Sequence, residues 1–376
     1  RRRLAALRCR CPQLHAAPTA QHTHTTRAQL AFLVSQLHVH GSCAKICSRD
    51  TLTSKGIIDP TTIMADSAPR LLIVGCGGVG GYFGGRLALK NRPCFLCREG
   101  AHYDALCANG LELKDGINAE HIKVKPLPRE ASLSACEGEP SALFTTSLDG
   151  LSPFDVVVIT TKLVDFGSGN AKLSALAPHV APNAIVFSLQ NGVEATEMLA
   201  AAFGKRVVSA QCFISSFKTE PGKVHCVTGN TKGTIALGER RASEAFAQSG
   251  SGSERCKRLQ ANLVSCGTSC VVPEDMDIEL WRKFVLSSTY GLFALGRLPF
   301  KIGCVVPETR AVILAAMRET IAVAAAANVI LPDKMATDFI ELLSKSPVAV
   351  KCSTLRDVEA SKPSEIEDLS GSVIRL

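Results

Sequence analysis

Short apolar runs that end in turn residues dominate the chain between residues 70 and 210. The runs lie at residues 71–74, 93–97, 154–160, 184–188 and 207–210. Stretches with helical spacing separate them, and most positions in each run are apolar, as expected for strands buried on both faces. Strands of this kind that alternate with helices are typical of a parallel sheet covered by helices on both sides. The pattern therefore predicts a Rossmann-type, doubly wound α/β domain.

The pattern changes in two steps after this region. Between residues 223 and 237, β-branched residues alternate with turn residues, which indicates an antiparallel addition at the edge of the sheet, and a last strand is expected at 269–272. From Asp277 onward, stretches rich in alanine and leucine follow helical spacing to the end of the chain. We therefore predict a Rossmann domain over residues 67–275 and an all-helical C-terminal domain over residues 276–376.

The first 66 residues differ from the rest in charge. They carry +6 of the chain's formal net charge of +8, and residues 1–49 contain no acidic residue. Such a composition is typical of a chloroplast or mitochondrial transit peptide. Because Met64 stands just before the first predicted strand, a cytoplasmic protein that starts at Met64, preceded by mistranslated leader sequence, explains the same pattern. Both interpretations predict that residues 1–66 are disordered.

Composition argues against several other classes of protein. The chain beyond residue 66 has no basic stripe with interleaved aromatic residues, so no nucleic-acid partner is predicted. The apolar stretch at 71–85 contains seven glycines and is too short to span a membrane, so no membrane association is predicted. The sixteen cysteines follow no repeated spacing, and close pairs such as Cys94/Cys97 lack a second pair of ligands. We expect reduced thiols and no metal site.

The first predicted strand runs directly into Gly75-Cys76-Gly77-Gly78-Val79-Gly80, which matches the pattern G-x-G-x-x-G. A helix pattern follows this motif. Between a strand and a helix, the free N–H groups at the helix N-terminus favour a phosphate, and the glycines let it approach the backbone. The motif therefore predicts that these six residues bind a dinucleotide. The alternative is a glycine-rich turn that serves only to pack the helix on the sheet.

Arg98 stands at the end of the second predicted strand, where NAD-binding proteins carry an acid that binds the ribose 2′-hydroxyl. A guanidinium group pairs with the 2′-phosphate of NADP, and the absence of the carboxylate removes a repulsion against that phosphate. We therefore expect NADPH rather than NADH as the cofactor. The alternative is a solvated surface arginine, with Glu99 beside it.

Four further motifs follow along the chain: Thr161-Lys162, Leu189-Gln190-Asn191-Gly192-Val193, Leu280-Trp281-Arg282-Lys283-Phe284 and Ser364-Glu365-Ile366-Glu367-Asp368-Leu369-Ser370-Gly371. In their order and spacing these motifs resemble those of the ketopantoate reductase (2-dehydropantoate 2-reductase) family. The likeness extends from about Arg70 to the last residue. It implies NADPH-dependent reduction of a 2-oxoacid, 2-dehydropantoate, to (R)-pantoate, a step of pantothenate and coenzyme A biosynthesis.

The resemblance also implies roles for the matching residues that bind cofactor and substrate. Arg98 and Lys162 are expected to hold the adenine-side phosphates of NADPH. Asn191 is expected to lie between the nicotinamide ribose and the substrate, and Ser353 is expected to contact the substrate carboxylate. Considered without the family, Ser353 is a surface serine and Asn191 belongs to an ordinary turn.

Two charged residues carry the implied catalytic roles, Lys283 as the proton donor and Glu365 as the acid that orients hydroxyl groups. Hydride addition to a ketone leaves a developing alkoxide, which a desolvated lysine can both stabilise and protonate. Lys283 is therefore expected to face a cleft, and the alternative is a lysine that reaches solvent from a half-buried helix. Residues 364–367 match a capping box, which would place Glu365 in a first helical turn where the helix dipole keeps it ionised. Considered without the family, Glu365 is an ordinary acidic residue at a helix N-terminus.

Two positions after Lys283 depart from the better-known members of this family. Those members have asparagines one and two helical turns later, which bind the substrate, whereas this chain has Ser287 and Gly291. Ser287 keeps a donor and an acceptor, so it stays a predicted substrate contact, and Gly291 has no side chain, so we expect an enlarged pocket. Because the family continues with further helical sequence, we also expect the chain to be truncated at Leu376.

Three functions fit these residues. The first is reduction of 2-dehydropantoate by NADPH, and the second is reduction of a different, bulkier 2-oxoacid, which Ser287 and Gly291 favour. The third is a non-catalytic NADPH-binding protein that acts as a redox sensor or a scaffold. Lys283 and Glu365 argue against the third function, because a pure binder needs no proton donor. The expected ligand is thus a small-molecule 2-oxoacid, and a homodimer is compatible with the resemblance.

Overall fold

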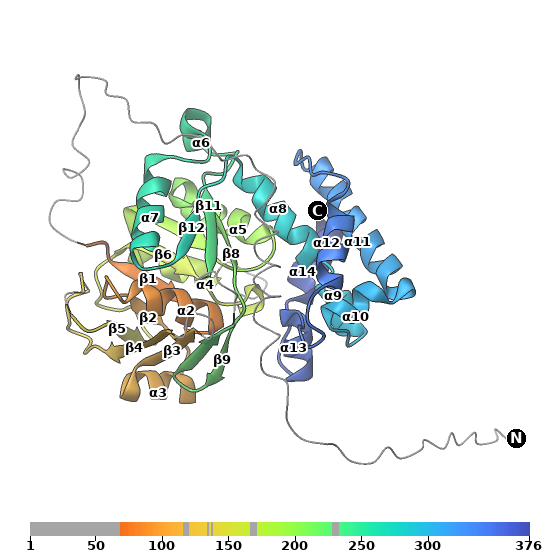
Figure 1. The fold of residues 1–376 in the computed structure, drawn as a ribbon. Coiled ribbons are helices and arrows are strands. Elements are labelled where there is room, and N and C mark those ends of the chain that lie inside the picture. Colours follow the sequence, from red (N-terminus) through yellow and green to blue (C-terminus); the bar gives the residue numbers. More distant parts are fainter. Residues whose placement is uncertain (1–67, 116–119, 134, 137, 166–170, 228–232) are drawn as a thin grey trace, which may run out of the picture.

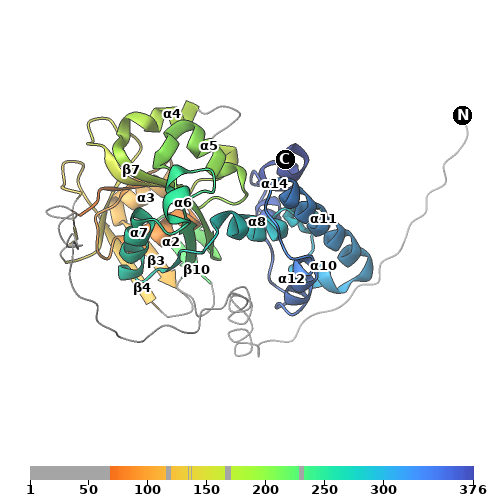
Figure 2. The ribbon, with the colours of Figure 1, turned by 90° about the horizontal axis from the view of Figure 1, so that it is seen from above.

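The computed structural model describes residues 68–115, 120–133, 135–136, 138–165, 171–227 and 233–376, and the predicted leader at 1–66 lies outside them. Figures 1 and 2 show a part that contains the sheets and a helical part, joined by the helix α8 (Met276–Ser287). The predicted fold class, a Rossmann-type α/β domain followed by a helical domain, is confirmed. Within the described ranges, no helix is long and apolar enough to cross a membrane.

The main sheet of the described residues has nine strands in the spatial order β7-β6-β1-β2-β5-β4-β3-β10-β9. In chain order these are β1 (Leu71–Val74), β2 (Cys94–Leu96), β3 (Leu111–Asp115), β4 (Glu120–Pro126), β5 (Ser141–Thr145), β6 (Phe154–Ile159), β7 (Val180–Ser188), β9 (Ser216–Glu220) and β10 (Lys223–Cys226). The strands β1, β2, β5, β6 and β7 pair in parallel. Strands β2 and β6 lie on opposite sides of β1, so the strand order reverses at β1. Doubly wound sheets bind ligands beside such a reversal of strand order.

The strands beyond β5 form a mixed extension of this sheet. β3 pairs antiparallel with β4, and β9 pairs antiparallel with β10. Buried and exposed residues alternate along β3 and β4, whereas β1 and β5 are buried throughout. This alternation is expected where only one face of a sheet is covered.

Three other strands form a second sheet in the order β12-β11-β8. They are β8 (Ser209–Phe213), β11 (Thr234–Gly238) and β12 (Ser269–Val271). The prediction that the run at 207–210 continues the main sheet is wrong, because only an isolated bridge joins Val207 to Val186 of β7. The predicted antiparallel addition at 223–237 is likewise divided between the two sheets. An apolar run indicates that a strand is buried but does not indicate which strand it pairs with.

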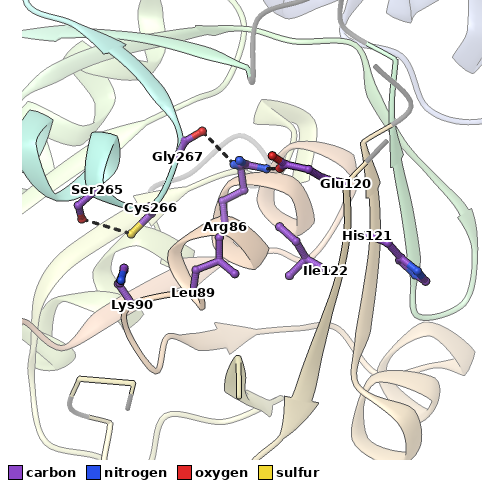
Figure 3. Close-up of a pocket in the computed structure, with 9 residues that line it drawn as sticks. All are labelled: Arg86, Leu89, Lys90, Glu120, His121, Ile122, Ser265, Cys266 and Gly267. Carbon is purple, nitrogen blue, oxygen red and sulfur yellow. Dashed lines mark hydrogen bonds and ion pairs between the residues drawn. The ribbon is translucent and has the colours of Figure 1, made fainter. Parts of the chain in front are cut away.

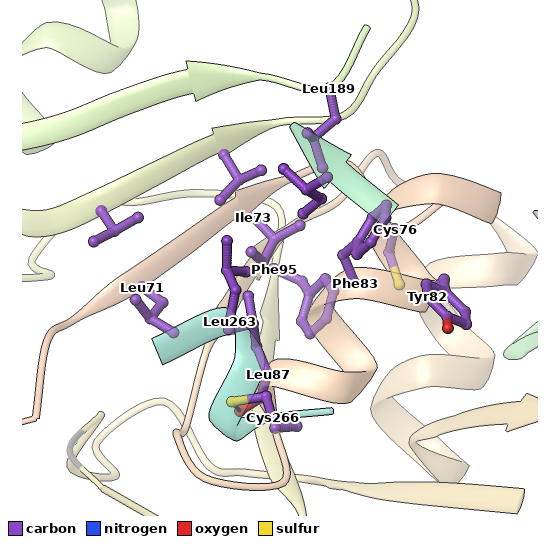
Figure 4. Close-up of a cluster of buried hydrophobic side chains, with 14 of the residues drawn as sticks. Leu71, Ile73, Cys76, Tyr82, Phe83, Leu87, Phe95, Leu189, Leu263 and Cys266 are labelled. Atoms are coloured by element: carbon purple, nitrogen blue, oxygen red, sulfur yellow. Dashed lines mark hydrogen bonds between the residues drawn. The ribbon is translucent and has the colours of Figure 1, made fainter. Parts of the chain in front are cut away.

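Helices cover both faces of the central strands. They are α2 (Gly78–Leu87), α3 (Ala101–Asn109), α4 (Ala171–Leu176), α5 (Glu194–Phe203), α6 (Glu244–Ser249) and α7 (Glu254–Ser265), with short 3₁₀ turns at η1 (Leu163–Asp165), η2 (Ala177–His179) and η3 (Gly204–Arg206). Leu71 and Ile73 of β1 share a core with α2 and α7, as Figure 4 shows. Leu72 and Val74 point the other way and pack against α4 and α5. One strand thus supports two cores, because successive side chains of a strand alternate between faces.

The helical part begins at α8 and returns to the Rossmann domain at its end. It continues with α9 (Tyr290–Leu295), α10 (Phe300–Val305), α11 (Pro307–Ala326), α12 (Met335–Ser344), α13 (Ser353–Glu359) and α14 (Ile366–Arg375), around a core of its own. The carboxylate of Asp275 caps α8 by accepting the N–H groups of Asp277 and Ile278. At the other end of this part, Arg375 of α14 binds Glu194 of α5 at 2.6 Å. The two parts are therefore held together at α8 and at α14.

Candidate functional site

The glycine turn between β1 and α2 is shaped by close packing on one side. A Cβ atom at Gly80 would lie 2.1 Å from the Gly75 carbonyl oxygen, and a Cβ atom at Gly78 would lie 2.3 Å from the Ser216 carbonyl oxygen. A Cβ atom at Gly77, in contrast, would have no atom of the described residues within 4 Å. Gly78 and Gly80 therefore let the helix start against the neighbouring strands, while Gly77 borders open space.

The open side of the turn has the donors that a phosphate needs. No side chain caps the N-terminus of α2, and the first turn of this helix contains no acidic residue. Its backbone N–H groups and the positive end of the helix dipole thus suit an anion. The Cys76 side chain is buried in the core and Val79 packs against that core, so these two residues offer only their backbone. The turn fits the pyrophosphate group of a dinucleotide.

Arg98 extends from the end of β2 into solvent. Its side chain is 83% exposed, and its Nη1 atom lies 3.1 Å from Oδ1 of Asp165 in η1. Such an exposed ion pair contributes about 0–1 kcal/mol to stability. The guanidinium group can therefore exchange this carboxylate for a phosphate at small energetic cost.

Lys162, the second predicted phosphate contact, follows β6 and is directed at the helical part. Its ammonium group lies 2.5 Å from Oδ2 of Asp357 in α13 and donates to the carbonyl oxygen of Pro363 at 3.1 Å. The backbone N–H of Lys162 donates to Asp165, the same residue that binds Arg98. The two predicted cations thus share one neighbour, Asp165.

Asn191 and Glu365 are in direct contact, although they are 174 residues apart. The amide nitrogen of Asn191, which follows β7, donates to Oε2 of Glu365 at 3.2 Å. Gly192 has a φ of +91°, a conformation that favours glycine, and a Cβ atom there would lie 3.2 Å from the carbonyl oxygen of Asp368 in α14. This turn therefore allows the first turn of α14 to approach the end of β7.

The environment of Glu365 differs from the predicted capping box. Glu365 is itself the residue that precedes α14, and no side chain caps this helix. The side chain is only 5% exposed, and this burial raises the pKa of its carboxyl group, while the Asn191 hydrogen bond and the Lys162 charge oppose the rise. The predicted capping box is therefore absent, and burial opposes the effect on this carboxyl group that was expected from the helix dipole.

Lys283 lies on α8 against the second sheet rather than in bulk solvent. Its ammonium group donates to the carbonyl oxygen of Cys212 in β8 at 2.8 Å and lies 5.7 Å from the ring centre of Phe213. Burial raises the pKa of the Cys212 thiol, the Lys283 charge opposes this rise, and the Glu365 charge adds to it. Lys283 and Glu365 are thus both close enough to Cys212 to act on it electrostatically.

Cys212 of β8 thus links Lys283, which donates to its carbonyl oxygen, with Glu365, whose charge acts on its thiol and whose carboxylate accepts from Asn191. The Cys212 thiol also contacts the carbonyl oxygen of Leu189, two residues before Asn191, at 3.5 Å. One positive group, one amide and one buried carboxyl group consequently converge from three separate segments of the chain. Cys212 was not predicted as part of the site, because a cysteine in a strand has no distinguishing sequence pattern.

The two predicted serine contacts have different environments. Ser287, one turn after Lys283, is completely buried, and its hydroxyl group has no hydrogen-bond partner among the described residues. A buried hydroxyl group without a partner is unfavourable, and because Ser287 is fully buried, a ligand could reach its hydroxyl group only if neighbouring side chains moved. Ser353 is half-buried at the start of α13, the helix that also carries Asp357.

The expected enlargement of the pocket at Gly291 is wrong. A Cβ atom at this position would lie 2.6 Å from the Ser370 hydroxyl oxygen and 3.1 Å from two carbon atoms of Ile366. The side chains of α14 therefore occupy the space that an asparagine would need. The glycine lets α14 pack closely on α9, and it leaves an apolar residue, Ile366, where a polar side chain was expected.

Replacing Glu365 with glutamine tests the effect of its burial. The raised pKa means that the folded protein binds a proton more tightly than the unfolded chain, so ionised Glu365 destabilises the fold, and the effect disappears as the pH falls below the ordinary value of 4.5. Glutamine still accepts the Asn191 hydrogen bond and carries no charge. We expect a larger free energy of unfolding for Glu365→Gln than for wild type at pH 7 to 8, and a smaller difference near pH 4.5.

Denaturant titrations at several pH values measure this difference. The same variant is expected to lose about tenfold or more in kcat if the carboxylate orients hydroxyl groups. A variant that is less stable than wild type at every pH would show that the ionised carboxyl group stabilises the fold.

A separate cavity of about 380 Å³ lies at the other end of α2 (Figure 3). It is lined by Arg86, Leu89, Lys90, Glu120, His121, Ile122, Ser265, Cys266 and Gly267. Arg86 is already bound to Glu120 at 2.6 Å and to the carbonyl oxygen of Gly267 at 3.1 Å. None of the residues predicted to bind cofactor or substrate lines this cavity.

The chain is similar to known proteins along most of its length. A 2-dehydropantoate 2-reductase of Mesorhizobium japonicum (strain LMG 29417 / CECT 9101 / MAFF 303099) is 26% identical over 331 residues, which cover 82% of this chain and 91% of that protein. The solved structure of 2-dehydropantoate 2-reductase from Geobacter metallireducens GS-15 has a TM-score of 0.68 at 26% identity, covering 81% of this chain and 92% of that chain. A D-mandelate dehydrogenase, solved with NADH and anilino(oxo)acetate, has a TM-score of 0.66 at 15% identity, covering 81% and 90%; this likeness concerns the fold alone.

Family models match both parts of the fold. The model described as Ketopantoate reductase PanE/ApbA matches residues 71–242, and the model described as Ketopantoate reductase PanE/ApbA C terminal matches residues 275–376. Together they cover well over half of the chain, and each falls on one of the two parts described above. The chain therefore belongs to the ketopantoate reductase PanE/ApbA family.

Proposed function

We propose that this chain reduces 2-dehydropantoate to (R)-pantoate with NADPH. Family membership makes the chain an oxidoreductase that uses a nicotinamide dinucleotide, so the non-catalytic sensor or scaffold is not pursued further. The observation that carries the proposal is the contact of Lys283, on α8, with Cys212 of β8, a residue on which the charge of Glu365, the partner of Asn191, also acts.

The residues of the glycine turn fit the cofactor, and we assign three side chains to it. The backbone from Gly75 to Gly80 would hold the pyrophosphate, and Arg98 and Lys162 would bind the adenine-side phosphates. Asn191, at the end of a neighbouring strand, would contact the nicotinamide ribose. The bound, reduced nicotinamide supplies the hydride that the carbonyl carbon of the 2-oxoacid accepts.

Lys283 is assigned as the proton donor. The carbonyl oxygen of Cys212 holds its ammonium group in place, and an ammonium group at the substrate ketone both stabilises the developing negative charge and donates the proton from Nζ. Glu365, held by Asn191, accepts hydrogen bonds from hydroxyl groups of the substrate and thereby orients it. Ser353 remains the proposed contact of the substrate carboxylate. Ser287, one helical turn after Lys283, remains a second proposed substrate contact.

A panel of 2-oxoacids tests the substrate. The full chain is assayed for NADPH oxidation with 2-dehydropantoate, pyruvate and 2-oxoisovalerate. We expect kcat/KM for 2-dehydropantoate to exceed the other two values by at least tenfold, because a site that hydrogen-bonds a substrate hydroxyl group discriminates against substrates that lack it. Equal or higher values for 2-oxoisovalerate would contradict the proposed substrate while leaving the reaction class intact.

One observation favours a second candidate, reduction of a different 2-oxoacid on the same fold. Ile366, which is 41% exposed, lies beside Gly291 together with the Ser370 hydroxyl group, so the surface here contains an apolar side chain. An apolar wall favours an apolar substrate side chain over a hydroxyl group. Adding phenylglyoxylate to the panel addresses this candidate, which predicts that phenylglyoxylate or 2-oxoisovalerate has the highest kcat/KM.

A further inference from the structure

The ammonium group of Lys162, which the proposed function assigns to a cofactor phosphate, is already bound to an anion within the chain. Its Nζ atom lies 2.5 Å from the Asp357 carboxylate and donates to the Pro363 carbonyl oxygen at 3.1 Å. The side chains of Lys162 and Asp357 are 35% and 16% exposed, so water and salt screen this pair less than they screen the exposed pair of Arg98. A phosphate that approaches Lys162 therefore meets a lysine whose charge is neutralised.

The helix α13, which carries Asp357, makes a second contact with the Rossmann domain. The guanidinium group of Arg356 lies 5.8 Å from the ring centre of Phe217 in β9. The preceding residue, Ser216, borders the glycine turn, because its hydroxyl group donates to the Gly78 carbonyl oxygen at 2.8 Å. The helix α13 thus contacts β9 through Arg356 as well as Lys162 through Asp357.

Both segments that α13 touches are neighbours of the glycine turn. Thr160 and Thr161, just before Lys162, lie against this turn. The Thr160 hydroxyl group donates to the Gly75 carbonyl oxygen. A Cβ atom added at Gly75 would have the Thr161 side chain as its nearest neighbour. Ser216 lies against it from β9. Two adjacent residues of α13, Arg356 and Asp357, thus bind the two strand ends that flank the proposed phosphate site.

We propose that Asp357 is an internal competitor of the cofactor: it holds Lys162 in the cofactor-free protein and releases Lys162 to a phosphate of the dinucleotide, and α13 moves away from the glycine turn when it does so. Asp357 is in this sense a positioning residue that sets the affinity for the cofactor. The inference rests on the proposed function, because it needs Lys162 to bind a cofactor phosphate.

The energetic consequence follows from competition for one charge. If NADPH binds only the state in which Lys162 is released, its apparent dissociation constant equals the intrinsic constant divided by the released fraction. Removing the Asp357 charge raises that fraction and tightens binding. A substitution of Asp357 that damaged the fold would lower the affinity for NADPH instead, since a disrupted site binds more weakly. A gain of affinity is therefore a signature that a merely structural role of Asp357 does not produce.

The experiment measures the dissociation constant of NADPH for the full chain by calorimetry, without a substrate. We expect Asp357→Asn to lower this constant by about threefold to tenfold, which corresponds to a charge pair worth about 0.7–1.4 kcal/mol at this site. We also expect the advantage over wild type to shrink at high salt, where the wild-type pair is itself weakened. An unchanged or higher dissociation constant in Asp357→Asn would overturn the proposal.

A matched control lies on the same helix. Glu359 pairs with Lys351 at 2.7 Å, both side chains are 34% exposed, and Glu359→Gln removes one negative charge from α13 without touching Lys162. We expect this variant to bind NADPH with the wild-type dissociation constant. An equal gain of affinity in Glu359→Gln and Asp357→Asn would attribute the effect to the net charge of α13 and would overturn the role of Asp357.

Variants of Lys162 separate the failure of this inference from the failure of the proposed function. Lys162→Met is expected to weaken NADPH binding, and Asp357→Asn is expected to have no further effect in the Lys162→Met background. Wild-type affinity in Lys162→Met would show that this lysine binds no phosphate, which overturns its assigned role and the inference together. Weaker binding by Lys162→Met without a gain in Asp357→Asn would overturn the inference alone.

Discussion

Lys283→Ala is expected to lower kcat for NADPH oxidation with 2-dehydropantoate by about 10²-fold to 10⁴-fold, the range over which a positioned proton donor contributes. The physical reason is that the alkoxide that develops after hydride transfer would lose both a positive charge and its proton source. The dissociation constant of NADPH is expected to change little, because the ammonium group contacts β8 and not the glycine turn. Steady-state kinetics and calorimetry on the same preparation measure both quantities.

Lys283→Arg is the matched variant for this prediction. A guanidinium group keeps the positive charge but remains protonated throughout the accessible pH range, so it is a poor proton donor. We expect its kcat to stay at least tenfold below wild type. A kcat for Lys283→Ala within about threefold of wild type, in a variant with an unchanged melting temperature, would rule out Lys283 as the proton donor.

Gly80→Ala is expected to destabilise the protein by about 3 kcal/mol or more, so that little folded protein is recovered. The added Cβ atom would lie 2.1 Å from the Gly75 carbonyl oxygen and 2.3 Å from the Thr160 hydroxyl oxygen. That hydroxyl group also donates to the Val74 carbonyl oxygen at 2.9 Å, so neither neighbour can move without disturbing the contact between β1 and β6. Thermal denaturation of the purified variant measures the loss.

Gly77→Ala, three residues earlier in the same turn, is the matched control. Gly77 has a φ of −81°, which alanine adopts easily, and within the part of the chain that the structure describes no atom lies within 4 Å of the added Cβ atom. Its stability is therefore expected to stay within about 0.5 kcal/mol of wild type. NADPH binding is nevertheless expected to weaken, because the methyl group projects into the space assigned to the pyrophosphate. Unchanged affinity in this folded variant would contradict that assignment.

The glycine-rich turn and the two elements that flank it were the most predictable from sequence. A strand, a glycine-rich turn and a helix follow one another within residues 71–87, so their geometry depends mainly on neighbouring residues. The change from alternating strands and helices to a helical C-terminal part was also predictable, because the two periodicities differ clearly. The roles assigned to Lys283 and Glu365 came from the resemblance to a family, because a lysine or a glutamate in a helix is locally unremarkable.

The contacts between distant segments were not predictable in this way. The pair Lys162–Asp357 joins residues 195 positions apart, and no spacing rule connects them. The shift in the pKa of Glu365 follows from burial, which depends on how α14 packs against the end of β7. The loss of the pocket expected at Gly291 likewise depends on the position of Ile366 in another helix.

Local pattern alone was thus sufficient for the strand, glycine-rich turn and helix within residues 71–87 and for the change from an α/β part to a helical part, because each is encoded by residues close together in the chain. It was not sufficient for β3, β4 and β5, which lie in a stretch where helical spacing was expected. Tertiary packing decided which strands formed the second sheet, which anion neutralises Lys162 and what fills the space beside Gly291. These features depend on the free energy of burying and pairing groups that meet only after the chain has folded. A periodic sequence pattern indicates which residues are buried but not which residues they contact.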